Sequence, residues 1–436
     1  MDIYIETLGC PKNVNDSEIA AGILERAGHR VTGSIEEADA VIVNTCCFIE
    51  DAKRESLASI FDAAAAKKKG ALLIVTGCLP ERYRDRLFKQ LHEADIVIGV
   101  NDYDDLPSLI ENHVEKRQMR FSEAENVYRE APIRRLPDAP YSATLKIAEG
   151  CDNRCTYCVI PSVRGRYRSR KAEDIESEAA SLAALGCHEL IIVAQDVTAY
   201  GIDLYGGYEL PGLLHRLCGV EGIRWIRLMY CYEDRITDEL IETIRREEKI
   251  CNYIDIPVQH CSDKILKAMN RRSTKESIRG SVERLRKRIP DIHIRSTVIT
   301  GFPGEGSGEF RELLEFVEDM KFERLGVFAY SKEEGTPAAK MKPQVLGKVK
   351  ESRKNSIMLR QLEISRNINA QKVGGVFEVM VEGVDGTGAY FGRTRYDAPE
   401  IDNAVIFSSK KMLEAGDLVN VEITDAFDYD LTGREV

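Results

Sequence analysis

The sequence of 436 residues lacks several features that are typical of particular classes of protein, and each absence argues against one class. No apolar run approaches the ~20 residues needed to cross a bilayer, and Met1 to Cys10 lacks the charged start and apolar block of a secretory signal. We therefore expect a cytoplasmic protein with no membrane partner. Solenoid repeats and low-complexity segments are also missing. A formal net charge of −11 argues against a large nucleic-acid surface, although it leaves room for a local basic groove.

Cysteine, in contrast, is abundant, with twelve residues in the chain. Disulfides are disfavoured in a reducing compartment, so this number indicates metal or redox chemistry rather than covalent cross-links. Which of the two applies depends on how the cysteines are placed.

The first 130 residues alternate between apolar strands and helical stretches, which predicts a parallel α/β sheet. The expected strands are Ile3–Glu6, Ala40–Asn44, Leu72–Thr76 and Ile96–Gly99. One expected helix covers Asp16–Ala27, with Asn15 or Asp16 as its cap and Gly28 at its end. Residues 131–141, which include the proline-rich APIRRLPDAP, are expected to form a linker.

Residues 142–371 contain six further apolar strands that alternate with helices such as Glu173–Leu185 and Lys275–Arg288. The expected strands are Thr144–Ala148, Leu190–Ala194, Trp225–Met229, Tyr253–Val258, Ile294–Ile299 and Leu325–Ala329. Right-handed βα units of this number predict a partial (βα)6 barrel with its chemistry at the carboxyl ends of the strands. A charged amphipathic helix, Val345–Gln371, is expected to close this domain.

Residues 372–436 have a different pattern, with short strands separated by Gly and Asp turns. This favours a small antiparallel β-barrel or sandwich. The tail holds six Lys and Arg against thirteen Asp and Glu, so most of the net negative charge of the chain lies here. The sequence thus predicts an α/β protein of three domains, 1–130, 142–371 and 372–436.

Three cysteines, Cys151, Cys155 and Cys158, lie within the segment EGCDNRCTYC directly after a predicted strand. We call them the loop triad. This CxxxCxxC spacing suits three irons of a 4Fe-4S cube and leaves the fourth iron open to the amino and carboxylate groups of S-adenosylmethionine (SAM). Tyr157 is then placed to pack near the adenine. A structural zinc site, the alternative, requires separated cysteine pairs and a fourth ligand.

A second set of cysteines appears when the predicted strands are aligned, because three of them end in cysteine: IYIETLGC at Cys10, VIVNTC at Cys46 and LLIVTGC at Cys78. We call these the strand-end triad. The carboxyl ends of parallel strands lie on one edge of a sheet, so the three thiols are expected to converge and to ligate a second cluster. Gly9 and Gly77 would let the backbone approach it closely. The alternative is that these are buried cysteines that pack as small apolar residues.

Other residues follow the strands of the predicted barrel, at the rim where a cofactor is expected. Gln195 follows the second strand, and Gly301 and Gly304, within GFPGE, follow the fifth. We predict that these three contact the cofactor, although GFPGE is equally compatible with a simple turn. His260, after the fourth strand, is interpreted as structural. The basic run from Arg164 to Lys171 would hold a carboxylate of cofactor or substrate, or form a solvated helix entry.

Taken together, these motifs resemble the methylthiotransferases, a radical SAM family with two clusters and three domains. The resemblance covers the whole chain and is carried by TLGCPKNVNDSE, both cysteine triads, PSVRGRYRSR, QDVTAYG, GFPGE and a terminal domain similar to TRAM modules. Cys10-Pro-Lys-Asn and RTRYDAPEID (393–402) resemble the bacterial branch that modifies an aspartate of small-subunit ribosomal protein twelve. Glu233 departs from the family, in which a proline is expected.

The resemblance implies that the cluster of the loop triad reduces SAM and yields a 5′-deoxyadenosyl radical, which removes a hydrogen from the β-carbon of that aspartate. It implies that the cluster of the strand-end triad holds the sulfur, which is methylated by a second SAM, so that the product is 3-methylthioaspartate. An external one-electron reductant such as flavodoxin or ferredoxin is implied as a partner.

The acidic tail favours a basic ribosomal protein over tRNA as the substrate, because a negative surface repels phosphates. The alternatives are a tRNA adenosine methylthiotransferase that acts beside the anticodon, a non-catalytic iron-sulfur electron carrier, and sulfur insertion of the lipoyl type.

Overall fold

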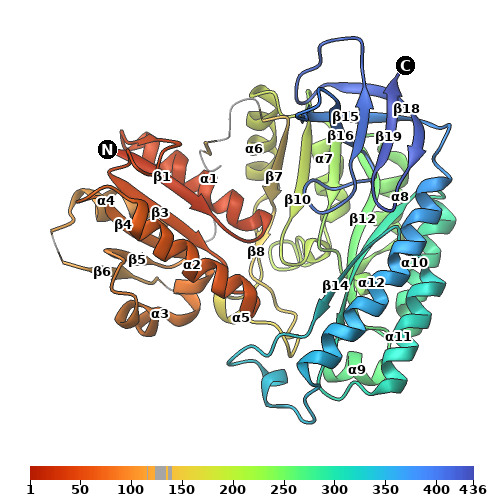
Figure 1. Ribbon diagram of the computed structural model, residues 1–436, viewed down its shortest axis with the longest axis horizontal. Helices are drawn as coiled ribbons and strands as arrows, with labels where there is room; N and C mark the ends of the chain where they lie inside the picture. Colours follow the sequence, from red (N-terminus) through yellow and green to blue (C-terminus); the bar gives the residue numbers. More distant parts are fainter. Residues whose placement is uncertain (115, 123–133, 136–139) are drawn as a thin grey trace. The chain divides into compact units, whose positions relative to one another are not determined.

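The structure of the chain, a computed structural model, describes residues 1–114, 116–122, 134–135 and 140–436 (Figure 1). Most of the predicted linker 131–141 lies outside the described residues. The chain divides into two compact units. The first comprises Met1–Asp138, Thr144–Glu178 and Ser331–Ala339, and the second comprises Ala139–Ala143, Ala179–Tyr330 and Lys340–Val436. Both cysteine triads belong to the first unit, so the loop triad is part of the same compact unit as the N-terminal sheet.

The first unit is built on a six-stranded sheet in the order β2-β1-β3-β4-β5-β6, and all its strand pairs are parallel. The strands are β1 (Asp2–Thr7), β2 (Arg30–Val31), β3 (Ala40–Thr45), β4 (Leu72–Gly77), β5 (Ile96–Ile98) and β6 (Gln118–Arg120). The four strands predicted from apolar runs are confirmed. The sequence pattern did not predict β2 and β6, because both are short, polar edge strands.

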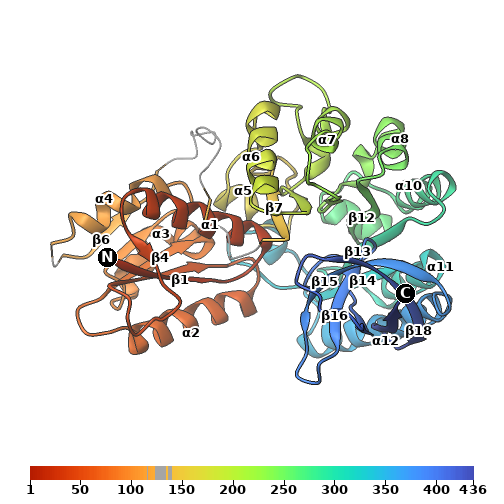
Figure 2. The same cartoon turned by 90° about the horizontal axis from the view of Figure 1, so that it is seen from above.

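Helices cover both faces of this sheet, as a parallel sheet requires. Helices α1 (Pro11–Arg26) and α4 (Leu106–Glu111), the latter preceded by η1 (Tyr103–Asp105), pack on the face that carries Ile42 and Ile74. Helices α2 (Glu50–Ala66) and α3 (Cys78–Gln90) pack on the face that carries Val43 and Val75. Figure 2 shows α1 and α2 on opposite sides of β1. The strand ends are thereby buried between two layers of helices.

Helix α1 begins earlier than the sequence predicted. Its N-cap is Cys10, with an extended backbone (φ −90°, ψ 166°), and Pro11 occupies the first turn. Proline suits this position because its fixed φ is helical and its missing N–H would have had no partner. Asn15 and Asp16 therefore lie buried inside the helix, and the prediction that one of them caps it was wrong. Gly28, at φ +88°, follows the helix end as predicted.

The second unit contains a sheet in the order β14-β13-β12-β11-β10-β7. Its strands are β7 (Ser142–Lys146), which continues into the first unit, β10 (Glu189–Val193), β11 (Trp225–Leu228), β12 (Ile250–Gln259), β13 (His293–Thr300) and β14 (Arg324–Ala329). The pairs from β10 to β14 are parallel. These are the six predicted strands, and the predicted partial barrel is confirmed.

Helices alternate with these strands in the manner of βα units, and a last helix follows β14. They are α6 (Ala172–Ala184), α7 (Leu210–Cys218), α8 (Asp238–Arg246), α9 (Asp263–Ala268), α10 (Lys275–Arg288), α11 (Ser307–Met320) and α12 (Gly347–Ala370), with short 3-10 turns η2 (Val197–Ala199), η3 (Glu233–Arg235) and η4 (Pro337–Lys340). Thr274 caps α10 through a reciprocal pair of hydrogen bonds with Ser277. Helix α12 packs on α11 and on β14 (Figure 1).

The chain ends in a closed barrel in the order β15-β16-β17-β19-β18. The strands are β15 (Val376–Val384), β16 (Tyr390–Thr394), β17 (Val405–Ser408), β18 (Leu418–Ala426) and β19 (Leu431–Glu435). The barrel is antiparallel except for the pair β17–β19, and Val379, Phe407 and Val421 lie in its core. The predicted fold class is confirmed, although the polar strand β19 was not anticipated.

Residues 393–402, which begin in the last two residues of β16, pack against the strands of the large sheet in the second unit. Arg393 donates to Glu189 at the start of β10 at 2.9 Å, and Glu189 also accepts from Arg227 of β11 at 2.9 Å. Burial would raise the pKa of Glu189, but the two arginines lower it to about 2. In the same way Asp397 accepts from Arg324 at 2.9 Å. Buried ion pairs therefore attach this segment to the strands of the large sheet.

We expect Arg393→Ala to destabilise the second unit strongly. The substitution leaves Glu189 buried with one cation fewer, and breaking a buried pair on one side costs about 3–5 kcal/mol. Urea unfolding followed by circular dichroism would measure the loss. The matched control is Arg434→Ala, because Arg434 pairs with Glu422 on the surface and its loss should leave the midpoint close to that of the parent. Equal losses in the two variants would contradict this reading of the interface.

Candidate functional site

The strand-end triad lies at the carboxyl ends of three neighbouring strands of the first unit. Cys10 caps α1 after β1, Cys46 directly follows β3, and Cys78 is the first residue of α3 after β4. Burial raises the pKa of Cys78 to about 12, and the negative charges of Cys10 and Cys46 add to the shift. The three thiols therefore lie within electrostatic reach of one another, at the edge where a parallel α/β sheet usually binds its ligand.

Two glycines allow the backbone to pass close to these cysteines. A Cβ atom on Gly9, at φ +92°, would lie 2.6 Å from Cβ and 3.0 Å from Sγ of Cys46. A Cβ atom on Gly77, at φ +98°, would lie 2.6 Å from the backbone nitrogen of Thr45. Both positions thus exclude a side chain for two reasons, the backbone conformation and the lack of space.

We expect Gly77→Ala to destabilise the protein more than a comparable substitution elsewhere. Gly70 has a similar φ of +87°, but a Cβ atom on Gly70 would have no neighbour within 4 Å, so Gly70→Ala should cost only the backbone term of about 1–2 kcal/mol. Gly77→Ala must in addition displace the end of β3. Thermal unfolding of the two variants would separate these contributions, and equal losses would show that the space around Gly77 is not restricted.

Side chains to which the sequence analysis gave no role fix the loops of the strand-end triad. Asn13 donates to the carbonyl oxygens of Leu8 at 2.8 Å and of Thr45 at 3.0 Å, and so ties the first strand end to the second. The hydroxyl of Ser56 accepts from the amide of Cys46 at 3.0 Å and donates to its carbonyl at 2.8 Å. Asn13 was visible within the TLGCPKNVNDSE motif, whereas Ser56 has no local signal.

The loop triad is framed by a small antiparallel pair, β8 (Ala148–Glu149) and β9 (Arg168–Ser169), and by the short helix α5 (Ile160–Val163). Cys151 and Cys155 are buried and Cys158 is half-buried. The amide of Cys151 donates to the carbonyl of Gly165 at 3.1 Å, and the amide of Ile160 donates to Sγ of Cys158 at 3.4 Å. Burial raises the pKa of Cys158 to about 12, so a metal cluster would displace a proton from it.

Among the described residues, no three His, Cys, Asp or Glu side chains stand where they would ligate a single metal ion. A 4Fe-4S cube has a different requirement, because each cysteine binds a separate iron. Three mutually interacting thiols on separate backbone segments, approached by two glycines without side chains, fit this requirement in the strand-end triad. The loop triad fits it through its CxxxCxxC spacing.

The four residues predicted to contact the cofactor are divided between the two units. Tyr157 is half-buried in the loop of the first unit. In the second unit, Gln195 lies just beyond β10, and Gly301 and Gly304 follow β13 with φ values of +71° and +86°. Each of these three lies at the carboxyl end of its strand. The contact of all four with a cofactor stays a prediction.

Buried side chains hold the GFPGE segment in place. Glu305 accepts from the amide of Gly301 at 2.8 Å and from Arg353 at 2.6 Å. His260 lies 3.5 Å from Glu305 and accepts at Nδ1 from the amide of Ser262 at 3.0 Å. These contacts agree with the interpretation of His260 as a structural residue.

The arginines of the basic run after the loop triad differ in their exposure to solvent. Arg164 and Arg170 are buried, and both pair with carboxylates of the first unit itself, Arg164 with Asp16 and Arg170 with Glu178. Arg166, in contrast, is almost fully exposed, with 89% of its side chain accessible. The two buried arginines therefore already hold carboxylates of the protein.

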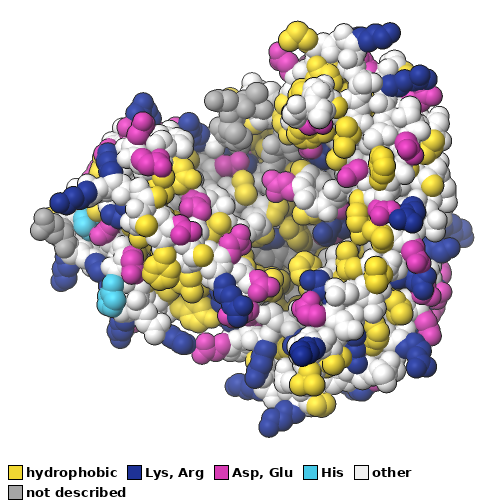
Figure 3. Space-filling model, viewed as in Figure 1, with side chains coloured by type: hydrophobic (Ala, Val, Ile, Leu, Met, Phe, Trp, Pro, Cys, Tyr) yellow, Lys and Arg dark blue, Asp and Glu magenta, His cyan; other side chains and the backbone are white. Residues whose placement is uncertain are grey.

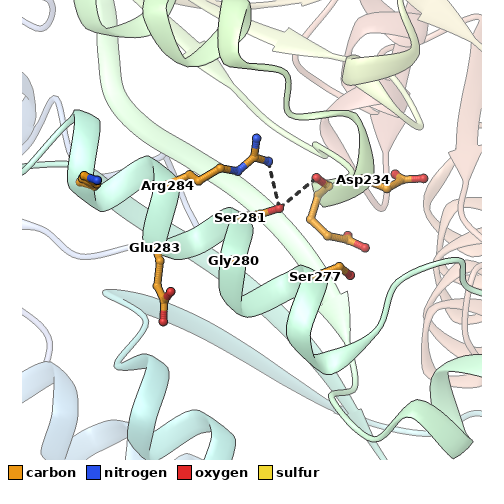
Figure 4. Close-up of a pocket in the computed structure, with 8 residues that line it drawn as sticks. Asp234, Ser277, Gly280, Ser281, Glu283 and Arg284 are labelled. Atoms are coloured by element: carbon orange, nitrogen blue, oxygen red, sulfur yellow. Dashed lines mark hydrogen bonds between the residues drawn. The ribbon is translucent and has the colours of Figure 1, made fainter.

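A groove in the second unit lies apart from these residues in the sequence. It has a volume of about 680 Å³ and runs between η3 and α10, with Asp234, Gly280 and Arg284 among its lining residues. Figure 4 shows Arg284 reaching toward Ser281, and Nη2 of Arg284 donates to the hydroxyl of Ser281 at 3.4 Å. The hydroxyl of Ser281 donates in turn to the carbonyl of Glu233 at 3.3 Å. None of the predicted site residues lines this groove.

Glu233 in this region is the residue at which the family is expected to have proline. Its carboxylate is buried and accepts from Arg271 at 3.0 Å, and the guanidinium of Arg271 lies 4.5 Å from the ring centre of Tyr232. Burial raises the pKa of Glu233. The departure from the family pattern is thus accommodated by an ion pair between Glu233, in η3, and Arg271.

Family models match three stretches of the chain. Residues 2–99 match an uncharacterized protein family, UPF0004, residues 145–317 match the radical SAM superfamily, and residues 373–436 match the TRAM domain. Solved structures show the same fold at low sequence identity. The SAM methyltransferase TsrM of Kitasatospora setae, with cobalamin and a [4Fe-4S] cluster bound, is 14% identical with a TM-score of 0.59, over 88% of this chain and 81% of that chain. The CxxxCxxC loop and the partial barrel thus define a radical SAM enzyme.

Curated relatives of high sequence identity identify the family within this superfamily. The protein of Acetivibrio thermocellus named ribosomal protein uS12 methylthiotransferase RimO is 48% identical over 444 residues, which cover 100% of this chain and 98% of the relative. Its namesake in Clostridioides difficile is 46% identical over 99% of this chain and 98% of the relative. The chain therefore belongs to the RimO family of radical SAM methylthiotransferases. No described helix is both long and apolar enough to cross a membrane.

Proposed function

We propose that this enzyme binds two 4Fe-4S clusters, on the loop triad and on the strand-end triad, and attaches a methylthio group to the β-carbon of an aspartate in ribosomal protein uS12, giving 3-methylthioaspartate. The main support is the location of the strand-end triad at the carboxyl ends of β1, β3 and β4, within the same compact unit as the loop triad. The full-length relatives, which are named for uS12, support the substrate.

When bound, the cofactors would supply the reductive cleavage of SAM at one cluster and the sulfur for transfer at the other. The task of the chain is to hold these parts in a fixed geometry. Cys151 is fixed by the hydrogen bond from its amide to the carbonyl of Gly165. Cys46 is fixed by two hydrogen bonds between its backbone and the hydroxyl of Ser56. Burial of four of the six cysteines, Cys46, Cys78, Cys151 and Cys155, limits the access of water, which protects a radical reaction from side reactions.

The charge of the terminal barrel supports a basic protein substrate. Asp397 is engaged in the internal ion pair with Arg324, so the sequence count overstates the negative charge at the surface. Exposed carboxylates remain at Asp385, Glu414 and Asp425. Figure 3 shows side chains of both signs interspersed over the visible face. A basic ribosomal protein would be attracted to the acidic excess, whereas an RNA backbone would be repelled.

We also propose an external one-electron reductant, such as flavodoxin or ferredoxin, and a cytoplasmic location, where the ribosome and such reductants occur. The competing substrate is an adenosine of tRNA beside the anticodon.

A reconstitution experiment distinguishes the two substrates. The loaded enzyme, SAM, dithionite and a sulfur source are incubated with either a uS12 peptide or unmodified tRNA, and the products are analysed by mass spectrometry. We expect the peptide to gain the mass of a methylthio group on its aspartate, and a peptide with asparagine at that position to stay unmodified. Methylthioadenosine in the tRNA together with an unmodified peptide would contradict the proposal.

A further inference from the structure

One residue of the first unit, Arg164, contacts the strand-end triad through its side chain and stands beside the backbone that holds the loop triad. The guanidinium of Arg164 donates through Nη2 to Sγ of Cys78 at 3.2 Å and to Oδ1 of Asn13 at 2.8 Å. Through Nη1 it donates to Asp16 at 2.6 Å and to Glu149 at 3.3 Å. The residue is buried, with 3% of its surface accessible. All four partners are fixed parts of the fold, so the guanidinium has a single orientation toward the Cys78 sulfur.

The backbone beside Arg164 holds the other triad. The carbonyl of Gly165 accepts from the amide of Cys151 at 3.1 Å. Glu149, which accepts from Arg164, lies two residues before Cys151 and pairs with Arg168 in the β8–β9 ladder. The segment 164–165 therefore contacts the loop triad through the main chain and the strand-end triad through a side chain.

The charges around Arg164 keep it ionised. Its guanidinium donates to the carboxylates of Asp16 and Glu149, and an arginine does not lose its proton in a protein. Lys146 also binds these carboxylates, donating to Glu149 at 2.9 Å and to Asp16. Two cations thus face two carboxylates in this buried cluster. The charge that directly contacts the sulfur is the positive one.

We propose that Arg164 is a positioning residue that anchors the cluster of the strand-end triad against the loop triad and raises the reduction potential of that cluster. This inference rests on the proposed function, in which Cys10, Cys46 and Cys78 ligate a cluster.

The direction of the effect follows from electrostatics. Reduction adds a negative charge to the cluster, and a fixed cation at hydrogen-bonding distance from a ligand sulfur stabilises the reduced form more than the oxidised form. A charge-assisted hydrogen bond also draws electron density from the sulfur. Removing the cation should therefore lower the potential.

The test uses the full-length chain with the loop triad removed by Cys151→Ala, Cys155→Ala and Cys158→Ala, so that only the cluster of the strand-end triad is observed. After iron and sulfide are reconstituted, its midpoint potential is measured by a redox titration followed by electron paramagnetic resonance. Adding Arg164→Gln should reduce the equilibrium constant for reduction about tenfold, which is about 59 mV for one electron. Arg166→Gln, in the same segment but exposed, is the control and should leave the potential unchanged.

Each outcome has a distinct meaning. A potential that is unchanged in Arg164→Gln, or that falls equally in Arg166→Gln, would overturn the inference while leaving the proposed function intact. If Arg164→Gln binds no cluster, Arg164→Lys is measured in its place. Lysine keeps the positive charge but cannot make all four hydrogen bonds of the guanidinium, so we expect a smaller shift of the potential with the same sign. An unchanged potential would overturn the inference. If the parent without the loop triad binds no cluster at all, the proposed function itself fails.

Discussion

Replacing Cys155 by alanine should reduce the formation of 5′-deoxyadenosine from SAM to the level of an enzyme-free control. A cluster that loses one of three cysteine ligands in the loop triad can no longer be held with a single open iron, and cleavage of SAM requires that site. The measurement is chromatography of the reaction mixture after reduction with dithionite.

The control is Cys218→Ala, because Cys218 is also a free cysteine but lies in α7 of the second unit, outside both triads. It should retain the cleavage of SAM. Undiminished cleavage in Cys155→Ala would show that the loop triad does not hold the cluster. An electron carrier without catalysis would fail to form 5′-deoxyadenosine in the parent as well.

Replacing Cys78 by alanine should separate the two halves of the reaction. The loop triad stays complete, so cleavage of SAM should continue, whereas transfer of the methylthio group should cease because the strand-end triad has lost a ligand. The iron content should fall from about eight to about four atoms per chain. Iron analysis, together with mass spectrometry of a uS12 peptide, measures both effects.

Cys47 provides a close control for this substitution. It is buried next to Cys46, but its Sγ donates to the carbonyl of Cys78 at 3.1 Å and it is not a member of the triad. Cys47→Ala should lose about 1 kcal/mol of stability with the hydrogen bond and should retain its iron and its product. Full product from Cys78→Ala, or loss of iron from Cys47→Ala instead, would refute the assignment of the strand-end triad.

Most strands and several helices could be predicted from the sequence because their apolar residues are periodic. The placement of the strand-end triad followed from the same pattern, since Cys10, Cys46 and Cys78 each end a recognisable strand. Errors occurred where no periodic signal exists. Strand β19 is polar, and the start of α1 was placed too late because the capping signal of Asn15 or Asp16 outweighed that of Pro11 at the first turn.

Side-chain pairings between distant segments could not be predicted. Arg164 and Cys78 are 86 residues apart, and nothing in the sequence near either residue indicates that they meet. The basic run suggested a site for a carboxylate from outside the protein, but burial requires that Arg164 be neutralised by groups that are fixed in the fold, such as Asp16 and Glu149. In the same way, part of the acidic charge of the tail serves the internal pair between Asp397 and Arg324.

The mass of ribosomal protein uS12 from a strain that lacks this gene tests the central claim most directly. In this strain uS12 should lose the mass of one methylthio group at a single aspartate, and the gene should restore it whereas the Cys78→Ala variant should not. The methylthioadenosine content of tRNA should stay the same. Unchanged modification of uS12 in the deletion strain, with loss of methylthioadenosine from tRNA, would contradict it.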